Sequence, residues 1–245
     1  MEHRNIGRNM YIEVLKCLEK VKAFEYVDKK FLAEIASELK TSKFSSGQDI
    51  ISFGDNTGDA YINFSGVLEV TYLLQEGKKV TFDIIAANRF FGEISSIDGK
   101  IRSATITALT DVTLVNIPCN YFRNVLMKNV DFTKGLLSEC ASRIRSNNQQ
   151  IVHLASADSM KKTIIQLLRL SKLRQTSQGS IKLVEGVSHE MIASFVGLSR
   201  ETVSRMISAS KKEGLITDTS KGNIVLDVEK ISKFIQMSED DVIDW

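Results

Sequence analysis

Two residue pairs in the amino-terminal half of the chain could hold a small anion together. Gly92-Glu93 and Arg102-Ser103 lie on either side of a short polar stretch in FGEISSIDGKIRSATI, residues 91–106. A guanidinium and a serine hydroxyl can both donate to a phosphate, and a carboxylate can accept from a ribose hydroxyl. A short helical turn over residues 92–96 would add backbone N–H groups. The predicted ligand-binding residues here are Gly92, Glu93, Ile94, Ser95, Arg102 and Ser103.

The same stretch allows a simpler interpretation. Glu93 and Arg102 could form an ion pair that only closes the loop between them, and an exposed pair of this kind contributes about 0–1 kcal/mol. Four chemically matched positions within one short stretch favour a ligand site over this alternative.

A second constellation, near the carboxyl terminus, is typical of DNA reading. Residues 187–210, VSHEMIASFVGLSRETVSRMISAS, contain two short helical patterns separated by Val196-Gly197-Leu198, which is helix-turn-helix spacing. Ser188 and Ser199 stand where helix N-caps are expected. Residues 158–234 hold 13 Lys/Arg against 8 Asp/Glu, a balance of +5, so the positive charge lies in this region.

The second helix of this motif separates its side chains by chemistry. Val203, Met206 and Ile207 share one face, and two arginines and a glutamate lie on the opposite face near the helix N-terminus. Arginine can donate twice to guanine and glutamate can accept from cytosine, while hydroxyl groups and a wing lysine suit phosphate contacts. The predicted DNA-binding residues are Ser199, Arg200, Glu201, Thr202, Ser204, Arg205 and Lys221.

The elements that position these groups follow from periodicity. Residues 10–40 have the apolar spacing of amphipathic helices, and residues 43–117 show short β-type runs punctuated by glycines, with Gly77 at a hairpin tip. Many short strands of this kind favour an antiparallel barrel or roll, ended by Pro118. After residue 158 we predict a helix at 159–174, a turn at 175–180, a strand near 181–184, the helix-turn-helix, a wing hairpin and a closing helix at Val228–Phe234.

A long helix from about Val130 to Ala155 connects the two halves. Cys140, Ile144, Asn147, Ile151 and Leu154 form a heptad seam on it. A stripe this narrow favours pairing with a second identical helix over packing on the β region, so we expect a homodimer. Asn147 on this seam could fix the register or meet a ligand.

Composition limits the remaining possibilities. The chain has 245 residues, 43% hydrophobic and 25% charged, and no apolar run of the roughly 20 residues that span a bilayer. Its three cysteines are widely spaced, which fits neither a disulfide framework nor a metal cluster. We therefore expect a cytoplasmic protein without a metal, and no set of catalytic residues that would indicate an enzyme.

The order of β-roll, long helix and winged helix, with the run SRETVSR at 199–205, resembles the Crp/Fnr family of bacterial transcription regulators. The resemblance implies an α+β fold with a cyclic-nucleotide-binding roll and amino-terminal helices at 1–129, a dimerisation helix and hinge at 130–157, a winged helix-turn-helix at 158–234 and an acidic tail at 235–245. Within it, the stretch FGEIS…RSAT is similar to the phosphate-binding cassette of cyclic-nucleotide-binding domains.

The resemblance also implies a function and its partners. Arg200, Glu201 and Arg205 match the family's base-reading residues, which implies inverted DNA repeats with TGTGA-like half-sites, and RNA polymerase is a possible partner. Members that bind cyclic AMP use small hydroxyl residues where this chain has Asn147 and Asn148. An asparagine can donate and accept, so cyclic AMP is the default ligand and cyclic GMP remains open. The alternatives are a ligand-independent regulator, and a signalling module whose winged helix binds protein.

Overall fold

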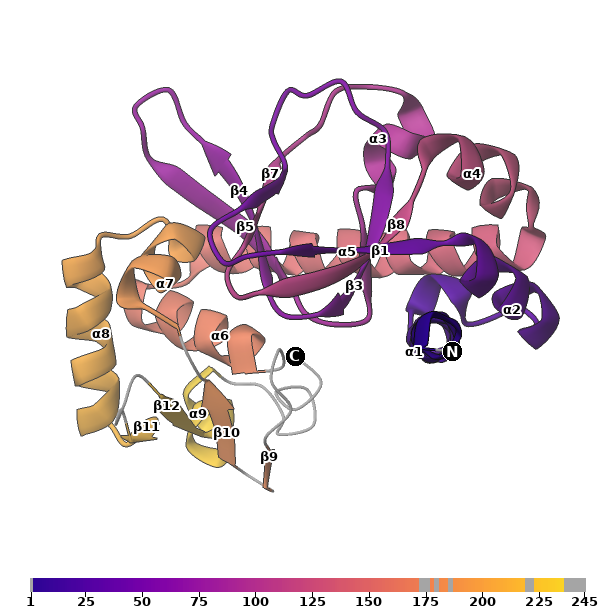
Figure 1. The fold of residues 1–245 in the computed structure, drawn as a ribbon. Coiled ribbons are helices and arrows are strands. Elements are labelled where there is room, and N and C mark those ends of the chain that lie inside the picture. Colours follow the sequence, from indigo (N-terminus) through magenta and orange to yellow (C-terminus); the bar gives the residue numbers. More distant parts are fainter. Residues whose placement is uncertain (1, 172–176, 179–180, 185–186, 219–222, 236–245) are drawn as a thin grey trace. The chain divides into compact units, whose positions relative to one another are not determined.

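The computed structural model describes residues 2–171, 177–178, 181–184, 187–218 and 223–235 (Figure 1). The chain divides into two compact units. The first comprises residues 1–72 and 83–146, and the second comprises residues 73–82 and 147–245. The division of the chain by role into four regions, given above, stays a prediction.

The first unit begins with helices and continues as short strands. Its helical elements are α1 (Glu2–Leu18), η1 (Lys22–Phe24), α2 (Lys29–Glu38), α3 (Glu93–Asp98), α4 (Cys119–Asn124), η2 (Leu126–Lys128) and the first part of α5 (Val130–Ser156). Its strands are β1 (Lys40–Phe44), β2 (Asp49–Ile51), β3 (Ala60–Ser65), β4 (Leu68–Leu73) as far as residue 72, β5 (Lys79–Ile85) from residue 83, β6 (Arg89–Phe91), β7 (Thr105–Ala108) and β8 (Val112–Ile117). Periodicity predicted the amino-terminal helices, most of the strands and the long helix, but not β6, α4 or η2.

The strands form two four-stranded sheets, which confirms the predicted antiparallel roll. Their orders are β1-β8-β3-β6 and β2-β7-β4-β5. Each described pairing is antiparallel, and β3 lies between β6 and β8, with a shift in its register against β8 between Asn63 and Ser65. Gly77 has φ 77° and closes the β4–β5 hairpin by donating to Leu74 at 2.9 Å, as its turn position predicts. Pro118 ends β8 and caps α4.

An aromatic cluster fixes β6 against the beginning of α5. Phe24, Phe90, Phe122 and Phe132 are all buried, and Phe132 lies 4.9 Å from Phe24 and 6.1 Å from Phe90 between ring centroids. Aromatic pairs at such distances stabilise a packing beyond the area they bury. Because Phe90 lies in β6 and Phe132 in α5, this cluster holds the turn after β6 beside that helix.

The second unit holds the remaining elements. They are the end of α5, then α6 (Ser159–Ser171), β9 (Ser177–Gln178), β10 (Ile181–Val184), α7 (His189–Val196), α8 (Arg200–Lys212), β11 (Ile216–Asp218), β12 (Ile224–Asp227) and α9 (Val228–Ile235). The strands form one sheet in the order β11-β12-β10-β9. Asp158 caps α6 by accepting from the Lys161 N–H at 2.8 Å, so the second series of elements begins where the sequence predicted.

Two predicted segments of the second unit, the helix at 159–174 and the turn at 175–180, are described only in part. The turn predicted at 175–180 is wrong for residues 177–178, which form a short strand and pair with Lys182 and Ile181 of β10. The predicted helix at 159–174 is confirmed to Ser171, and its last three positions lie outside the described residues.

Candidate ligand-binding and DNA-binding sites

The first candidate site is built on the turn between β6 and α3. Gly92 caps α3 with φ 78°, a left-handed conformation that L side chains rarely adopt. A Cβ at this position would lie 3.1 Å from the Asp59 carbonyl and 3.4 Å from Arg102 Nη1. Glycine is therefore favoured twice here, by its φ angle and by the close approach of the Asp59 carbonyl. This places the predicted Gly92 and Arg102 side by side.

Arg102 is a buried cation held by neutral oxygens. Its side chain donates to Thr57 Oγ1 at 2.8 Å, the Gly92 carbonyl at 2.8 Å and the Asp59 carbonyl at 2.6 Å. The residue is only 2% exposed. Burial lowers the pKa of its guanidinium from the ordinary value, although an arginine stays protonated in a protein.

The surroundings of Arg102 leave part of its bonding capacity unused. In the part of the chain that the structure describes, no carboxylate forms an ion pair with it. A guanidinium also carries more N–H donors than its three bonds use. An uncompensated buried charge is costly, so this position suits an anion such as a phosphate.

Glu93 is buried as well, at 4% exposure, but its partner is Arg143 of α5. Arg143 Nη1 donates to Glu93 Oε1 at 2.7 Å, and Nη2 donates to Glu139 Oε1 at 2.6 Å and to the Phe90 carbonyl. Burial lowers the pKa of Arg143, yet Glu93 and Glu139 raise it by more, so the net direction is upward. The Glu93–Arg102 pair considered as an alternative is therefore wrong: the ion pair runs from Glu93 to the long helix.

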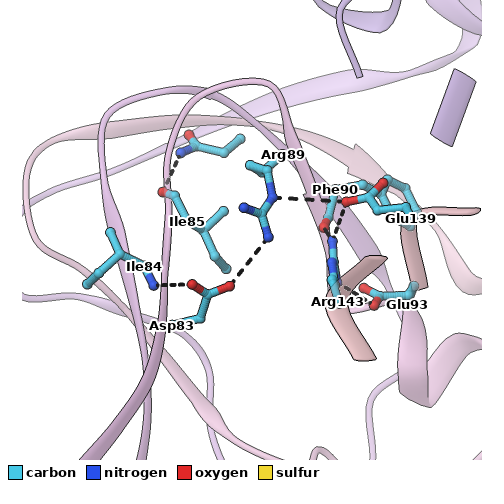
Figure 2. Close-up of polar contacts among 9 residues, drawn as sticks. Asp83, Ile84, Ile85, Arg89, Phe90, Glu93, Glu139 and Arg143 are labelled. Atoms are coloured by element: carbon cyan, nitrogen blue, oxygen red, sulfur yellow. Dashed lines mark hydrogen bonds and ion pairs between the residues drawn. The ribbon is translucent and has the colours of Figure 1, made fainter. Parts of the chain in front are cut away.

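Sequence reasoning missed Arg143 and Glu139. Figure 2 shows both beside Glu93, with Glu139 also 4.0 Å from Arg89 Nε. The available signal was their spacing of four residues on a helix, which allows an ion pair. That spacing is common on solvated helix faces and does not reveal a third partner from another element.

The remaining predicted ligand residues differ in exposure. Ser95 is buried in α3, and its carbonyl accepts from the Gly99 N–H at 3.1 Å, whereas Ile94 and Ser103 are exposed. Asn147 and Asn148 are exposed on α5 and belong to the second unit. The structure thus brings Gly92, Glu93 and Arg102 together, and the roles of all these residues stay predictions.

The α5 helix carries an apolar stripe on its surface. Val130, Leu137, Ile144 and Ile151 follow at intervals of seven residues and are each at least 60% exposed. Leu137 and Val130 continue the line of Ile144 and Ile151 toward the amino terminus, whereas Cys140 of the predicted seam packs against the buried core of the first unit. Among the described residues nothing covers the four exposed side chains, which is the arrangement expected of one helix of a coiled coil.

The second candidate site is the helix-turn-helix, whose predicted geometry is confirmed. Gly197, between α7 and α8, has φ 69°. Because glycine has no Cβ, it adopts this left-handed conformation without steric cost. Ser188 and Ser199 cap the two helices by accepting from the N–H groups of Met191 at 3.0 Å and Thr202 at 3.2 Å. The caps and the turn set the start of α8, where the predicted DNA contacts lie.

The side chains of α8 separate into a packed and an exposed face. Val203 and Ile207 are buried, while Arg200, Glu201 and Arg205 are exposed. Hydrogen bonds from its own backbone and from Ser199 lower the pKa of Glu201, so this carboxylate stays ionised and able to accept.

Of three other predicted DNA contacts, two have hydrogen-bond partners within the helix-turn-helix and one is outside the described residues. Thr202 Oγ1 accepts from Arg205 Nη2 at 3.2 Å, and Ser204 Oγ lies 2.7 Å from His189 Nδ1, so this half-buried hydroxyl already holds α7 to α8. Lys221 lies outside the described residues.

Comparisons with known proteins agree with both halves of this arrangement. Residues 41–129 match the family model of the cyclic nucleotide-binding domain, and residues 162–234 match the Crp-like helix-turn-helix domain. The chain belongs to the Crp/Fnr family of transcription regulators. This Crp/Fnr protein is accordingly a DNA-binding regulator with a domain of the cyclic-nucleotide-binding type, and the family is not one of enzymes.

Individual relatives cover most of the chain. A CRP-like cAMP-activated global transcriptional regulator of Mycobacterium tuberculosis is 25% identical over 86% of this Crp/Fnr chain and 94% of its own. A cAMP-activated global transcriptional regulator of Pasteurella multocida is 26% identical over 77% of this chain and 91% of its own. A c-di-GMP responsive global regulator of Xanthomonas campestris shares the fold, with a TM-score of 0.69, 19% identity and coverage of 81% and 99%.

The described residues also lack features typical of two other classes of protein. None of their helices has both the length and the apolar character to cross a membrane. No group of three or more potential metal-ligating His, Cys, Asp or Glu side chains is found within the same ranges.

Proposed function

We propose that this regulator is a homodimer that binds a cyclic nucleotide in its amino-terminal unit and then binds an inverted DNA repeat. The observation that carries the proposal is the buried Arg102 guanidinium, which has no carboxylate partner among the described residues. The phosphate of a cyclic nucleotide would supply the missing charge, with Ser103 donating beside it. Glu93, Gly92, Ile94 and Ser95 form the adjoining turn and helix.

Cyclic AMP is the proposed ligand. The relatives in Mycobacterium tuberculosis and Pasteurella multocida, which this chain matches over most of their length, are cAMP-activated regulators. Cyclic GMP is the alternative, because Asn147 and Asn148 can each donate and accept and so could meet either base.

The exposed stripe on α5 supports the homodimer. Its apolar side chains repeat every seven residues, the interval at which two parallel helices interlock. Pairing two identical chains in this way also places two reading helices on the two halves of a palindrome, which is how helix-turn-helix dimers bind.

Ligand control requires a difference in affinity between two states. Moving a regulator from 1:99 to 99:1 in favour of the DNA-competent state needs about 5.5 kcal/mol of differential binding. Two ligand sites in a dimer, each with a charge-assisted phosphate contact, can supply this together. The region Ala155–Asp158, which comprises the end of α5 and the two residues before α6, is the proposed hinge.

Calorimetry tests the ligand. The purified protein is titrated with cyclic AMP, with cyclic GMP and with buffer alone, and saturable heat with one nucleotide per chain is expected for cyclic AMP. Heat from neither nucleotide would instead support the ligand-independent regulator.

A salt titration tests the DNA partner. Each phosphate that the protein neutralises releases counterions, so the affinity for an inverted TGTGA-like repeat should fall steeply as ionic strength rises. An affinity for this DNA that is weak and insensitive to salt would favour the alternative in which the winged helix binds protein. RNA polymerase is the protein partner expected at promoters.

Replacing Arg200 with alanine tests the base contacts. Loss of a bidentate contact to guanine should weaken binding to the TGTGA-like site by about 1–3 kcal/mol and should remove the preference for guanine opposite it. Fluorescence anisotropy with the site and with a guanine-to-adenine variant measures both effects. If the alanine variant still discriminates between the two DNAs as the wild type does, the contact is assigned wrongly.

A further inference from the structure

A continuous series of charged side chains runs through the first unit to Glu93. Figure 2 shows Asp83, Arg89, Glu139, Arg143 and Glu93 in this order, so that negative and positive groups alternate. The successive nitrogen–oxygen distances are 3.3, 4.0, 2.6 and 2.7 Å. The series joins β5, β6, α5 and α3. It ends at Glu93, the carboxylate predicted above to accept from the ligand's ribose hydroxyl.

Arg143 is shared between two carboxylates within this series. One arm of its guanidinium bonds Glu93, and the other bonds Glu139 and the Phe90 carbonyl. Two carboxylates therefore share one guanidinium, and the group of three carries a net negative charge. Arg143 cannot turn both arms toward Glu93 while Glu139 holds one of them.

Glu139 is not well placed for stability alone. It is 5% exposed, and its Oε2 atom is buried without a hydrogen-bond partner in the described part of the chain, as is Nε of Arg143. Buried polar atoms without partners are costly, and each such atom in a native protein needs an explanation. An apolar side chain at position 139 would avoid the cost of the unpartnered Oε2 atom, so the carboxylate points to a role beyond packing.

We propose that Glu139 is a positioning residue for the ligand: it holds one arm of Arg143 away from Glu93, so that Glu93 keeps an oxygen able to accept from the ribose 2′-hydroxyl. This inference rests on the proposed function. Without the Glu139 carboxylate, the Nη2 arm of Arg143 keeps only the neutral Phe90 carbonyl and can turn toward Glu93, because arginine prefers to pair with a carboxylate through both arms. The ligand hydroxyl then competes with an intramolecular partner for the same oxygens.

The test compares two ligands that differ by this one hydroxyl. Wild-type protein and Glu139→Gln are each titrated by calorimetry with cyclic AMP and with 2′-deoxy-cyclic AMP. The wild type should prefer cyclic AMP, and in the variant this preference should fall by about three- to tenfold, the range expected for one weakened hydrogen bond to a charged group. Affinity for the deoxy ligand should stay constant. A role of Glu139 in folding alone would change both affinities together.

The control is Glu229→Gln on α9. Glu229 also pairs with a cation four residues ahead, Lys233 at 2.7 Å, but at an exposed position of the second unit. Its loss should leave the ratio of the two affinities unchanged. Where Glu139→Gln does not yield folded protein, Glu139→Met, which is similar in length and uncharged, serves the same comparison.

The possible results distinguish a failure of the proposed role of Glu139 from a failure of the proposed nucleotide binding. An unchanged ratio in the Glu139 variant, with both ligands still bound, would overturn the role of Glu139 and leave the nucleotide site intact. Failure of the wild type to bind these two ligands and cyclic GMP would overturn both the role of Glu139 and the proposed nucleotide site.

Discussion

Replacement of Arg102 by leucine is expected to abolish nucleotide binding and, with it, nucleotide-dependent DNA binding. The guanidinium is the one proposed cation for the phosphate, and charge-assisted hydrogen bonds to a buried anion are worth about 1.5–3 kcal/mol each. Loss of two such bonds lowers affinity by at least roughly 100-fold. Calorimetry with cyclic AMP measures the first effect, and fluorescence anisotropy with and without the nucleotide measures the second.

Arg123→Leu is the matched control for this change. Arg123 lies on α4 and also bonds backbone carbonyls of α3, those of Ser96 at 2.7 Å and Ser95 at 3.4 Å, but it is exposed. Its loss should leave nucleotide affinity within a few-fold of the wild type. Thermal unfolding of both variants shows whether each is folded. A folded Arg102→Leu protein with a normal response to nucleotide would refute the assignment of the phosphate site.

Replacement of Ile144 by aspartate is expected to dissociate the homodimer and to abolish binding to the inverted repeat. Ile144 lies in the middle of the exposed stripe on α5. In a paired helix the two substituted residues would bring two carboxylates into an apolar seam, and an uncompensated buried charge costs about 3–5 kcal/mol. The dimer dissociation constant should rise by more than about 100-fold. Sedimentation velocity across a concentration series measures it.

Val152→Asp makes the same chemical change away from the seam. Val152 is 59% exposed on the same helix. It follows Ile151 by one residue, so it lies about a quarter turn away from the line of residues spaced seven apart. This control should remain dimeric. Equal dissociation by both variants would indicate a general effect of charge on α5, and a dimeric Ile144→Asp protein would remove the coiled-coil interface.

Several elements could be predicted because their signals are local. The strands between residues 43 and 117 alternate and are punctuated by glycines. The caps Ser188 and Ser199, with Gly197 in the turn, define the helix-turn-helix within one short segment of the chain. The short β9 strand and β6 were not predicted, because strands of two or three residues carry no periodicity and depend on a neighbouring sheet edge.

The sequence by itself determined the fold class, the winged helix-turn-helix and the positions of Glu93 and Arg102 around one loop, since these depend on spacing along the chain. Only the tertiary structure decided their partners: Arg102 rests on neutral carbonyl and hydroxyl oxygens, while Glu93 pairs with Arg143 and, through it, with Glu139. The physical reason is that charge pairing depends on distance in space. The aromatic packing of Phe90 on Phe132 brings α5 beside the loop, and no local pattern encodes which of several arginines arrives there.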